Sequence, residues 1–143
     1  MNRHRSVAIA FAILALVPLT AQASFRTGDT ELDALLGSIN VEAKANLGPF
    51  VAELSAAFGY PQAEIEAWLN VDKLEPADAY FALNLAKLSG KTPQRVVDTY
   101  KKNRRRGWGA AARSVGVKPG SEQFKALKQD AGGQAEKARG RKK

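Results

Sequence analysis

The part of the chain from residue 30 to residue 128 is divided into short segments with helical spacing, and this division constrains the fold most. The clearest segment, residues 75 to 90, has Pro76 near its start and Gly90 just past its last apolar residue, an asymmetry typical of helices. No run alternates between apolar and polar residues as a half-buried strand would. The sequence therefore predicts an all-α domain, a compact bundle of about five to seven short helices.

Apolar residues cover nearly the whole circumference of the 75 to 90 segment, which predicts that it is the buried central helix. Hydroxyl residues precede three other segments, and their oxygens can accept hydrogen bonds from the free amides of a first helical turn. We therefore expect Thr30, Thr92 and Ser121 to be N-caps.

The chain contains no cysteine, and its single histidine is His4. Disulfides are therefore excluded, and the fold must be held together by apolar burial. Residues 24 to 143 contain neither histidine nor cysteine, which excludes Ser/His/Asp and Cys/His catalysis and the usual zinc and copper sites. An enzyme that uses only carboxylates, tyrosines or lysines is a third hypothesis, after a binding module and a nucleic-acid-binding protein. We expect no enzyme, no cofactor and no metal site.

Residues 1 to 23 have the layout of a cleavable signal peptide: arginines first, then an apolar run of about a dozen residues, then small residues. The run is shorter than the roughly 20 residues that span a bilayer core, which disfavours a retained membrane anchor. We expect cleavage near Ala23 and a periplasmic or secreted protein. The expected organisation is a signal peptide over 1–23, a helical domain over 24–128 and a disordered basic tail over 129–143.

Charge is divided unevenly along the chain. Residues 24 to 100 carry 6 basic and 11 acidic side chains, a net charge of −5, whereas residues 101 to 143 carry 14 basic and 3 acidic ones, a net charge of +11. Such a division is informative about partners rather than about fold. It indicates an anionic partner for the C-terminal third.

Five cations lie close together just before Trp108, and we call them the basic cluster: Lys101, Lys102, Arg104, Arg105 and Arg106. Cations beside an aromatic residue favour a phosphate-rich surface. They would also be stable as a solvated helix end, since positive charge there interacts favourably with the helix dipole. Trp108 itself has the spacing of a core residue. The candidate site is the basic cluster with Trp108, Arg113 and Lys118, and the candidate partner is an anionic envelope lipid, lipopolysaccharide or an acidic protein.

Residues 109 to 128 also have the pattern of a helix-turn-helix, with a short alanine-rich helix, a glycine and a second helix. Nucleic-acid binding is therefore the alternative function. The pattern is weak, because alanine packing followed by a glycine occurs in any short helical hairpin. Export disfavours it further, since an exported protein does not meet the chromosome.

The segment from residue 107 to residue 128 resembles one found in small exported bacterial proteins of unknown function. These share a Gly-Trp-Gly start, a Lys-Pro-Gly-Ser turn and a Phe-x-x-Leu-Lys finish, and the resemblance extends upstream to residue 50. It implies export and a helical fold and transfers no activity. The matching residues are Gly107, Trp108, Gly109, Gly116, Val117, Lys118, Pro119, Gly120, Ser121, Phe124, Leu127 and Lys128.

Overall fold

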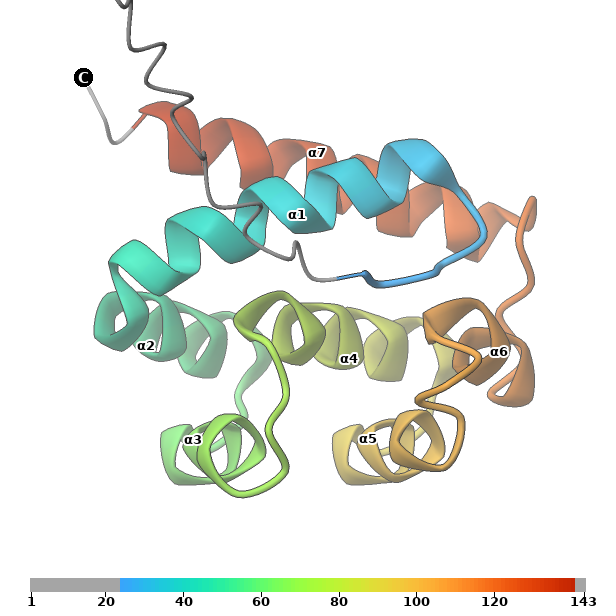
Figure 1. Ribbon diagram of the computed structural model, residues 1–143, viewed down its shortest axis with the longest axis horizontal. Helices are drawn as coiled ribbons and strands as arrows, with labels where there is room; N and C mark the ends of the chain where they lie inside the picture. The colour runs from blue at the N-terminus through green and yellow to red at the C-terminus, as the bar shows by residue number, and fades with distance from the viewer. Residues whose placement is uncertain (1–23, 141–143) are drawn as a thin grey trace, which may run out of the picture.

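The computed structural model describes residues 24 to 140, and this part of the chain is all-helical, as predicted (Figure 1). The signal peptide expected over 1–23 lies outside the described residues. Seven helices follow one another without a strand in the described range: α1 (Thr30–Ala45), α2 (Leu47–Phe58), α3 (Gln62–Asn70), α4 (Pro76–Ser89), α5 (Pro93–Lys102), α6 (Trp108–Ser114) and α7 (Glu122–Gly140).

The helix ends follow local chemistry. The Thr92 hydroxyl caps α5 by accepting from the Arg95 amide, and the Ser121 hydroxyl accepts from the Phe124 amide at the start of α7, both as predicted. Thr30 is not a cap, because it is already the first residue of α1. The carboxylate of Asp29 takes that role and accepts from the Leu32 amide at 3.0 Å. One residue thus separates the predicted cap from the observed one.

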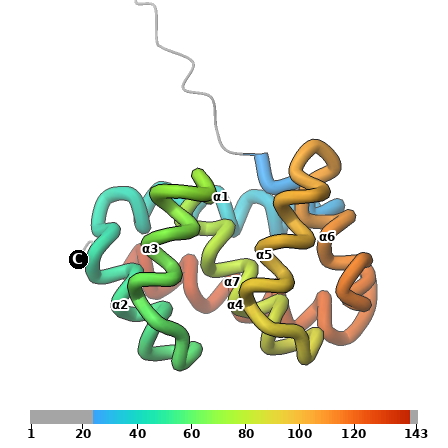
Figure 2. The backbone as a smooth tube through the Cα atoms, turned by 90° about the horizontal axis from the view of Figure 1, so that it is seen from below, coloured from blue at the N-terminus to red at the C-terminus, as the bar shows by residue number. Residues whose placement is uncertain are grey.

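Helix α4 lies at the centre of the bundle (Figures 1 and 2). The α1 and α7 helices run side by side on one side of it, and α3 and α5 cover the opposite side, with α2 and α6 at its two flanks. Every residue of α4 from Pro76 to Ala86 is buried, which confirms the prediction of a buried central helix. The apolar surface of α4 is therefore shared among several helices that would each be marginal alone.

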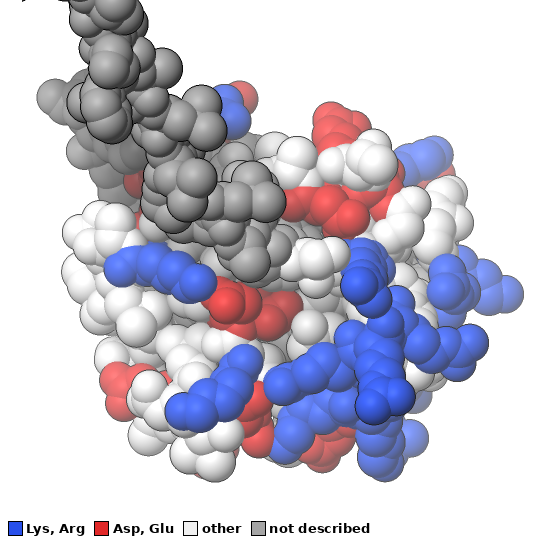
Figure 3. Space-filling model, viewed as in Figure 1, with Lys and Arg blue, Asp and Glu red and all other residues white. Residues whose placement is uncertain are grey.

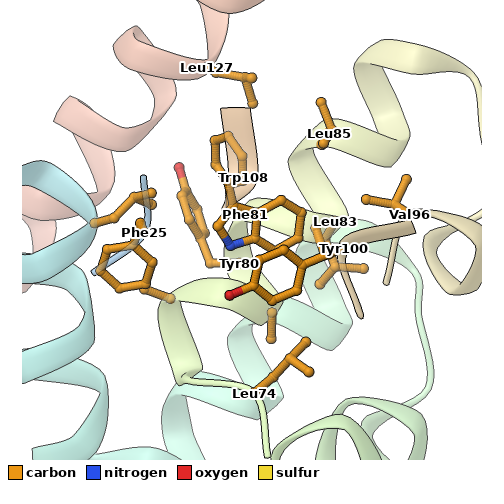
Figure 4. Packing of buried hydrophobic residues seen from close by; sticks show 14 of the residues in the cluster. Phe25, Leu74, Tyr80, Phe81, Leu83, Leu85, Val96, Tyr100, Trp108 and Leu127 are labelled. Atoms are coloured by element: carbon orange, nitrogen blue, oxygen red, sulfur yellow. The ribbon is translucent and has the colours of Figure 1, made fainter. Parts of the chain in front are cut away.

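An aromatic group forms the core where α4, α5 and α6 meet (Figure 4). The Trp108 ring stacks on Tyr100 with ring centroids 4.0 Å apart and meets the edge of Phe81 at 5.0 Å. Its indole N–H donates to Oδ1 of buried Asp78 at 2.7 Å, so its one polar atom is satisfied. Trp108 thus joins three helices at a single point.

Residues 24 to 29, here called the strap, form no helix or strand, and the strap contacts the start of α6. The Trp108 amide donates to the Phe25 carbonyl at 3.0 Å, and the Gly109 amide donates to the Arg26 carbonyl at 2.9 Å. The side chains of Phe25 and Thr27 are buried. The free amides at the start of α6 are therefore satisfied by a segment about eighty residues earlier in the chain.

Two glycines permit the strap to approach α6 so closely. A Cβ atom on Gly109 would lie 2.7 Å from the Thr27 carbonyl oxygen, and one on Gly107 would lie 2.4 Å from the Arg26 Cβ. Gly107 also has a positive φ of 80°, which other residues rarely adopt. The Gly-Trp-Gly sequence therefore combines a buried anchor with two positions where only hydrogen fits.

The structure corrects the predicted disordered tail. Residues 129 to 140 continue α7, and the alanines at 131, 135 and 138 are buried, with α7 lying along α1. The prediction considered large apolar residues at helical spacing and therefore did not include a stripe of alanines. Small side chains nevertheless form a helix contact, because they allow two helices to approach closely. The helical domain therefore extends to at least Gly140, and residues 141 to 143 lie outside the described part.

Candidate functional site

The basic cluster lies at the C-terminal end of α5 and in the turn that leads to α6. Val96, Val97 and Tyr100 face the core from α5, so the lysines that follow Tyr100 lie on the opposite, solvent side. Positive charge is favourable at this helix end because the last carbonyls carry the negative end of the dipole. All five side chains of the cluster are exposed. Helix geometry alone therefore accounts for their position, and their interactions show which of them can contact a partner.

One acidic residue, Asp72, holds part of the cluster in place. The Lys101 ammonium pairs with the Asp72 carboxylate, and the Arg104 guanidinium donates to the Asp72 backbone carbonyl at 2.8 Å. The Arg104 guanidinium also lies 5.8 Å from the centre of the Tyr100 ring, within cation–π range. The loop between α3 and α4 is thereby joined to the basic cluster.

The remaining cations of the predicted site are not neutralised. Among the described residues, no carboxylate forms an ion pair with Lys102, Arg105, Arg106 or Arg113, and all four are exposed. Figure 3 shows Lys and Arg side chains gathered over the end of the molecule where α5 and α6 lie. An anion approaching this end therefore meets several uncompensated positive charges.

Two residues of the predicted site, Trp108 and Lys118, are not part of this exposed group of cations. Trp108 is fully buried, at 0% exposure, which confirms the core position that its spacing predicts and contradicts its inclusion in the binding site. Its role is to hold the turn that carries the cations. Lys118 is exposed in the connection between α6 and α7, and no hydrogen bond or ion pair in the described part joins it to the basic cluster.

The structure adds Arg26 to this surface. Its guanidinium donates to the Arg105 backbone carbonyl at 2.8 Å, so the strap brings a sixth cation to the basic cluster. Sequence reasoning missed Arg26 because the two residues are 79 positions apart. No local pattern could have revealed the contact.

The buried polar groups behind the cluster have shifted acidities. Burial raises the pKa of the Asp78 carboxyl, although hydrogen bonds from the Trp108 indole and the Glu75 amide act in the opposite direction. Burial likewise raises the pKa of Tyr100 to about 12. The Tyr100 phenol is therefore protonated at neutral pH, and its ring stacks on Trp108.

A separate cleft of about 460 Å³ lies between α2, α4 and α7. Buried Tyr80 and Asn84 form its floor, and residues of both charges, among them Lys87 and Asp130, line its rim. Burial raises the pKa of Tyr80, so its phenol stays protonated at neutral pH. The cleft is distinct from the basic cluster and shares no residue with it.

The helix-turn-helix alternative meets a geometric difficulty. Seven residues, from 115 to 121, separate α6 from α7, whereas the turn of that motif has about 3 to 4. Helix α7 also packs along α1 over much of its length. The second helix therefore does not have the setting of a recognition helix.

Two further features bear on the chemistry of this surface. In the range from residue 24 to residue 140, no three His, Cys, Asp or Glu side chains come together as a metal-binding group. None of the helices described is long and apolar enough to cross a bilayer.

No family model, no curated protein and no solved structure matches the chain.

Proposed function

We propose that this chain is an exported, non-enzymatic binding module that docks on an anionic component of the cell envelope through its basic cluster. The observation that carries the proposal is the group of exposed cations at the α5–α6 turn that no carboxylate in the described part neutralises. Cations held apart from acidic side chains on a rigid frame are available to phosphate or carboxylate groups of a partner.

The frame supports this function because it limits the motion of the turn. Trp108 anchors one end in the core, Arg104 is tied to Asp72, and Arg105 receives the hydrogen bond from Arg26. Less conformational entropy is lost on binding when the binding groups are already ordered. The proposed compartment rests on residues 1–23, whose composition is that of a signal peptide.

The test is a pull-down of the protein on lipopolysaccharide and on anionic lipid vesicles at low and raised salt. Binding is expected at low salt and should weaken as salt rises, because exposed charges are screened. The triple variant Arg104→Ser, Arg105→Ser, Arg106→Ser should lose most of it. The matched control replaces three other exposed cations, Lys87, Lys91 and Arg95, by serine and should bind nearly normally.

Two results would reject the proposal: wild-type protein that binds neither material, or a triple variant that binds like the wild type. Mass spectrometry of the native polypeptide tests the compartment separately. A chain that begins at Ser24 in a periplasmic extract supports export, and a chain that still begins at Met1 among cytosolic proteins contradicts it.

A further inference from the structure

Two residues other than glycine have a left-handed backbone in the described part of the chain, and both are cations. Arg26 has a φ of 51° and Lys73 a φ of 57°. Such values are uncommon for side chains with a Cβ, and where they occur in polar residues they favour Asn and Asp. Glycine would adopt either position without strain. Local conformation therefore does not explain why a long basic side chain is found at both.

Both residues flank the basic cluster. Arg26 donates from its guanidinium to the Arg105 carbonyl. Lys73 directly follows Asp72, which pairs with Lys101 and accepts from Arg104. Strained backbone tends to be retained where the side chain has a function. The two strained positions and the cluster come from three separate segments, and the tertiary fold brings them to one end of the molecule.

An exposed apolar side chain directly precedes Asp72, the residue that pairs with Lys101. Val71 is 76% exposed, the highest value among the large hydrophobic residues that the structure leaves in solvent. It is one residue from Asp72, at the end of α3. A soluble anion such as polyphosphate has no apolar part that an exposed valine could enter. A lipid bilayer does, because its headgroups are anionic and its acyl boundary lies directly beneath them.

From this combination we infer that Arg26, Val71 and Lys73 join the basic cluster in a docking face for the surface of an anionic lipid bilayer. The inference rests on the proposed function and specifies its partner. The cations contact headgroup phosphates, and Val71 enters the boundary between headgroups and acyl chains. The protein lies on the membrane and does not span it.

The test measures binding to three probes: vesicles of phosphatidylcholine alone, vesicles of phosphatidylcholine and phosphatidylglycerol in equal parts, and soluble polyphosphate. The wild type should bind the phosphatidylglycerol vesicles and polyphosphate, and it should not bind the vesicles of phosphatidylcholine alone. Arg26→Gly and Lys73→Gly each remove a cation. Glycine adopts the left-handed backbone at these positions without strain, so folding should be retained. Each should lower partitioning onto anionic vesicles about fivefold. Lys91→Ser, an exposed cation elsewhere, is the matched control.

Val71→Ser separates the lipid surface from a soluble anion. It should weaken binding to phosphatidylglycerol vesicles several-fold, most visibly at raised salt, and leave polyphosphate binding unchanged. Thermal melts of all three variants show whether they remain folded.

Equal binding of the wild type to neutral and anionic vesicles would overturn the inference, as would vesicle binding by the variants that equals the wild type. Loss of polyphosphate binding in the Arg104, Arg105 and Arg106 triple variant, with these three variants normal on vesicles, would leave the proposed function intact and reject this docking face. A triple variant that binds every probe normally would reject both.

Discussion

At the scale of single residues, the glycines on either side of Trp108 decide how the strap meets α6. Their missing side chains allow the backbone amides of Trp108 and Gly109 to reach the carbonyls of Phe25 and Arg26. A glycine costs conformational entropy on folding, so two of them at adjacent contacts need a compensating gain. The two hydrogen bonds and the burial of Phe25 compensate for this loss of conformational entropy.

Replacement of Gly109 by alanine should destabilise the protein by about 2 kcal/mol, because the new Cβ atom collides with backbone rather than with a flexible side chain. Gly133→Ala is the matched control. Gly133 lies in α7 with no atom within 4 Å of an added Cβ, so this change should stabilise by up to about 1 kcal/mol. Urea denaturation measures both. Equal effects of the two substitutions would contradict the close contact.

Asp29 provides a pH-dependent contribution to stability. The hydrogen bond from the Leu32 amide, followed by the contact with the Lys128 ammonium at 3.0 Å, keeps the pKa of Asp29 below its ordinary value of 3.8 despite partial desolvation. An acid whose pKa is lowered by folding stabilises the folded state above its unfolded pKa. This contribution is lost as the pH falls through the folded value.

Asp29→Ala should therefore cost about 1 kcal/mol in the free energy of unfolding at neutral pH, where the charged cap is intact. The difference from the wild type should shrink below pH 3.8, where the carboxylate becomes protonated. Urea denaturation across this pH range measures it. A difference that stays constant down to acid pH would show that the charge of Asp29 is not what stabilises α1.

At the scale of helices, α7 shows how a polar, glycine-containing segment becomes ordered. Residues 129 to 140 have low intrinsic stability as an isolated helix, since they contain two adjacent glycines and many charges. The alanines at 131, 135 and 138 lie on one side and are buried. Contact with the rest of the bundle therefore stabilises a helix that its own sequence does not specify.

Deletion of residues 129 to 143 should lower the free energy of unfolding by about 2 kcal/mol, the value expected for losing three buried methyl groups. The helical signal in circular dichroism should fall as well. Ala135→Glu should reproduce much of the stability loss, because it places a charge at a buried position, whereas Glu136→Ala at the exposed neighbour should change little. If the deletion leaves the stability unchanged, residues 129 to 140 do not stabilise the fold, and the prediction of a disordered tail would be right.

At the scale of the whole molecule, the strap closes the fold by joining its first described residues to α6. Phe25 is 2% exposed and belongs to the same core as the central helix. Thr27 and Asp29 then lead directly into α1, with Asp33 accepting hydrogen bonds from the amide and hydroxyl of Thr27. The segment therefore positions α1 and Arg26 at the same time.

Phe25→Ala should destabilise the protein by about 3 to 5 kcal/mol, the range for removing a buried aromatic side chain. Ser24→Ala, at the exposed neighbouring residue, should alter stability by less than about 0.5 kcal/mol. Differential scanning calorimetry and urea denaturation measure both. If Phe25→Ala melts like the wild type, the strap is not part of the cooperative fold.

Helical class, the buried α4 and two of the three N-caps could be predicted from sequence, because each depends on residues a few positions apart. Thr92 lies three residues before the amide that it accepts from, and Pro76 and Gly90 mark the ends of α4 through their own backbone preferences. The basic cluster was found for the same reason, since its five members are almost contiguous. Local physics was sufficient for all of these.

The tertiary structure alone decided which distant residues share a surface or a contact. It brought Arg26 to Arg105 across 79 positions, joined the Trp108 indole to Asp78 and ordered the alanine stripe of α7. These outcomes depend on backbone approach and on burial against distant helices, which no short window of sequence encodes. Composition and spacing determined that the chain forms short helices with a basic C-terminal third, and long-range packing determined the shape of the surface that those charges form.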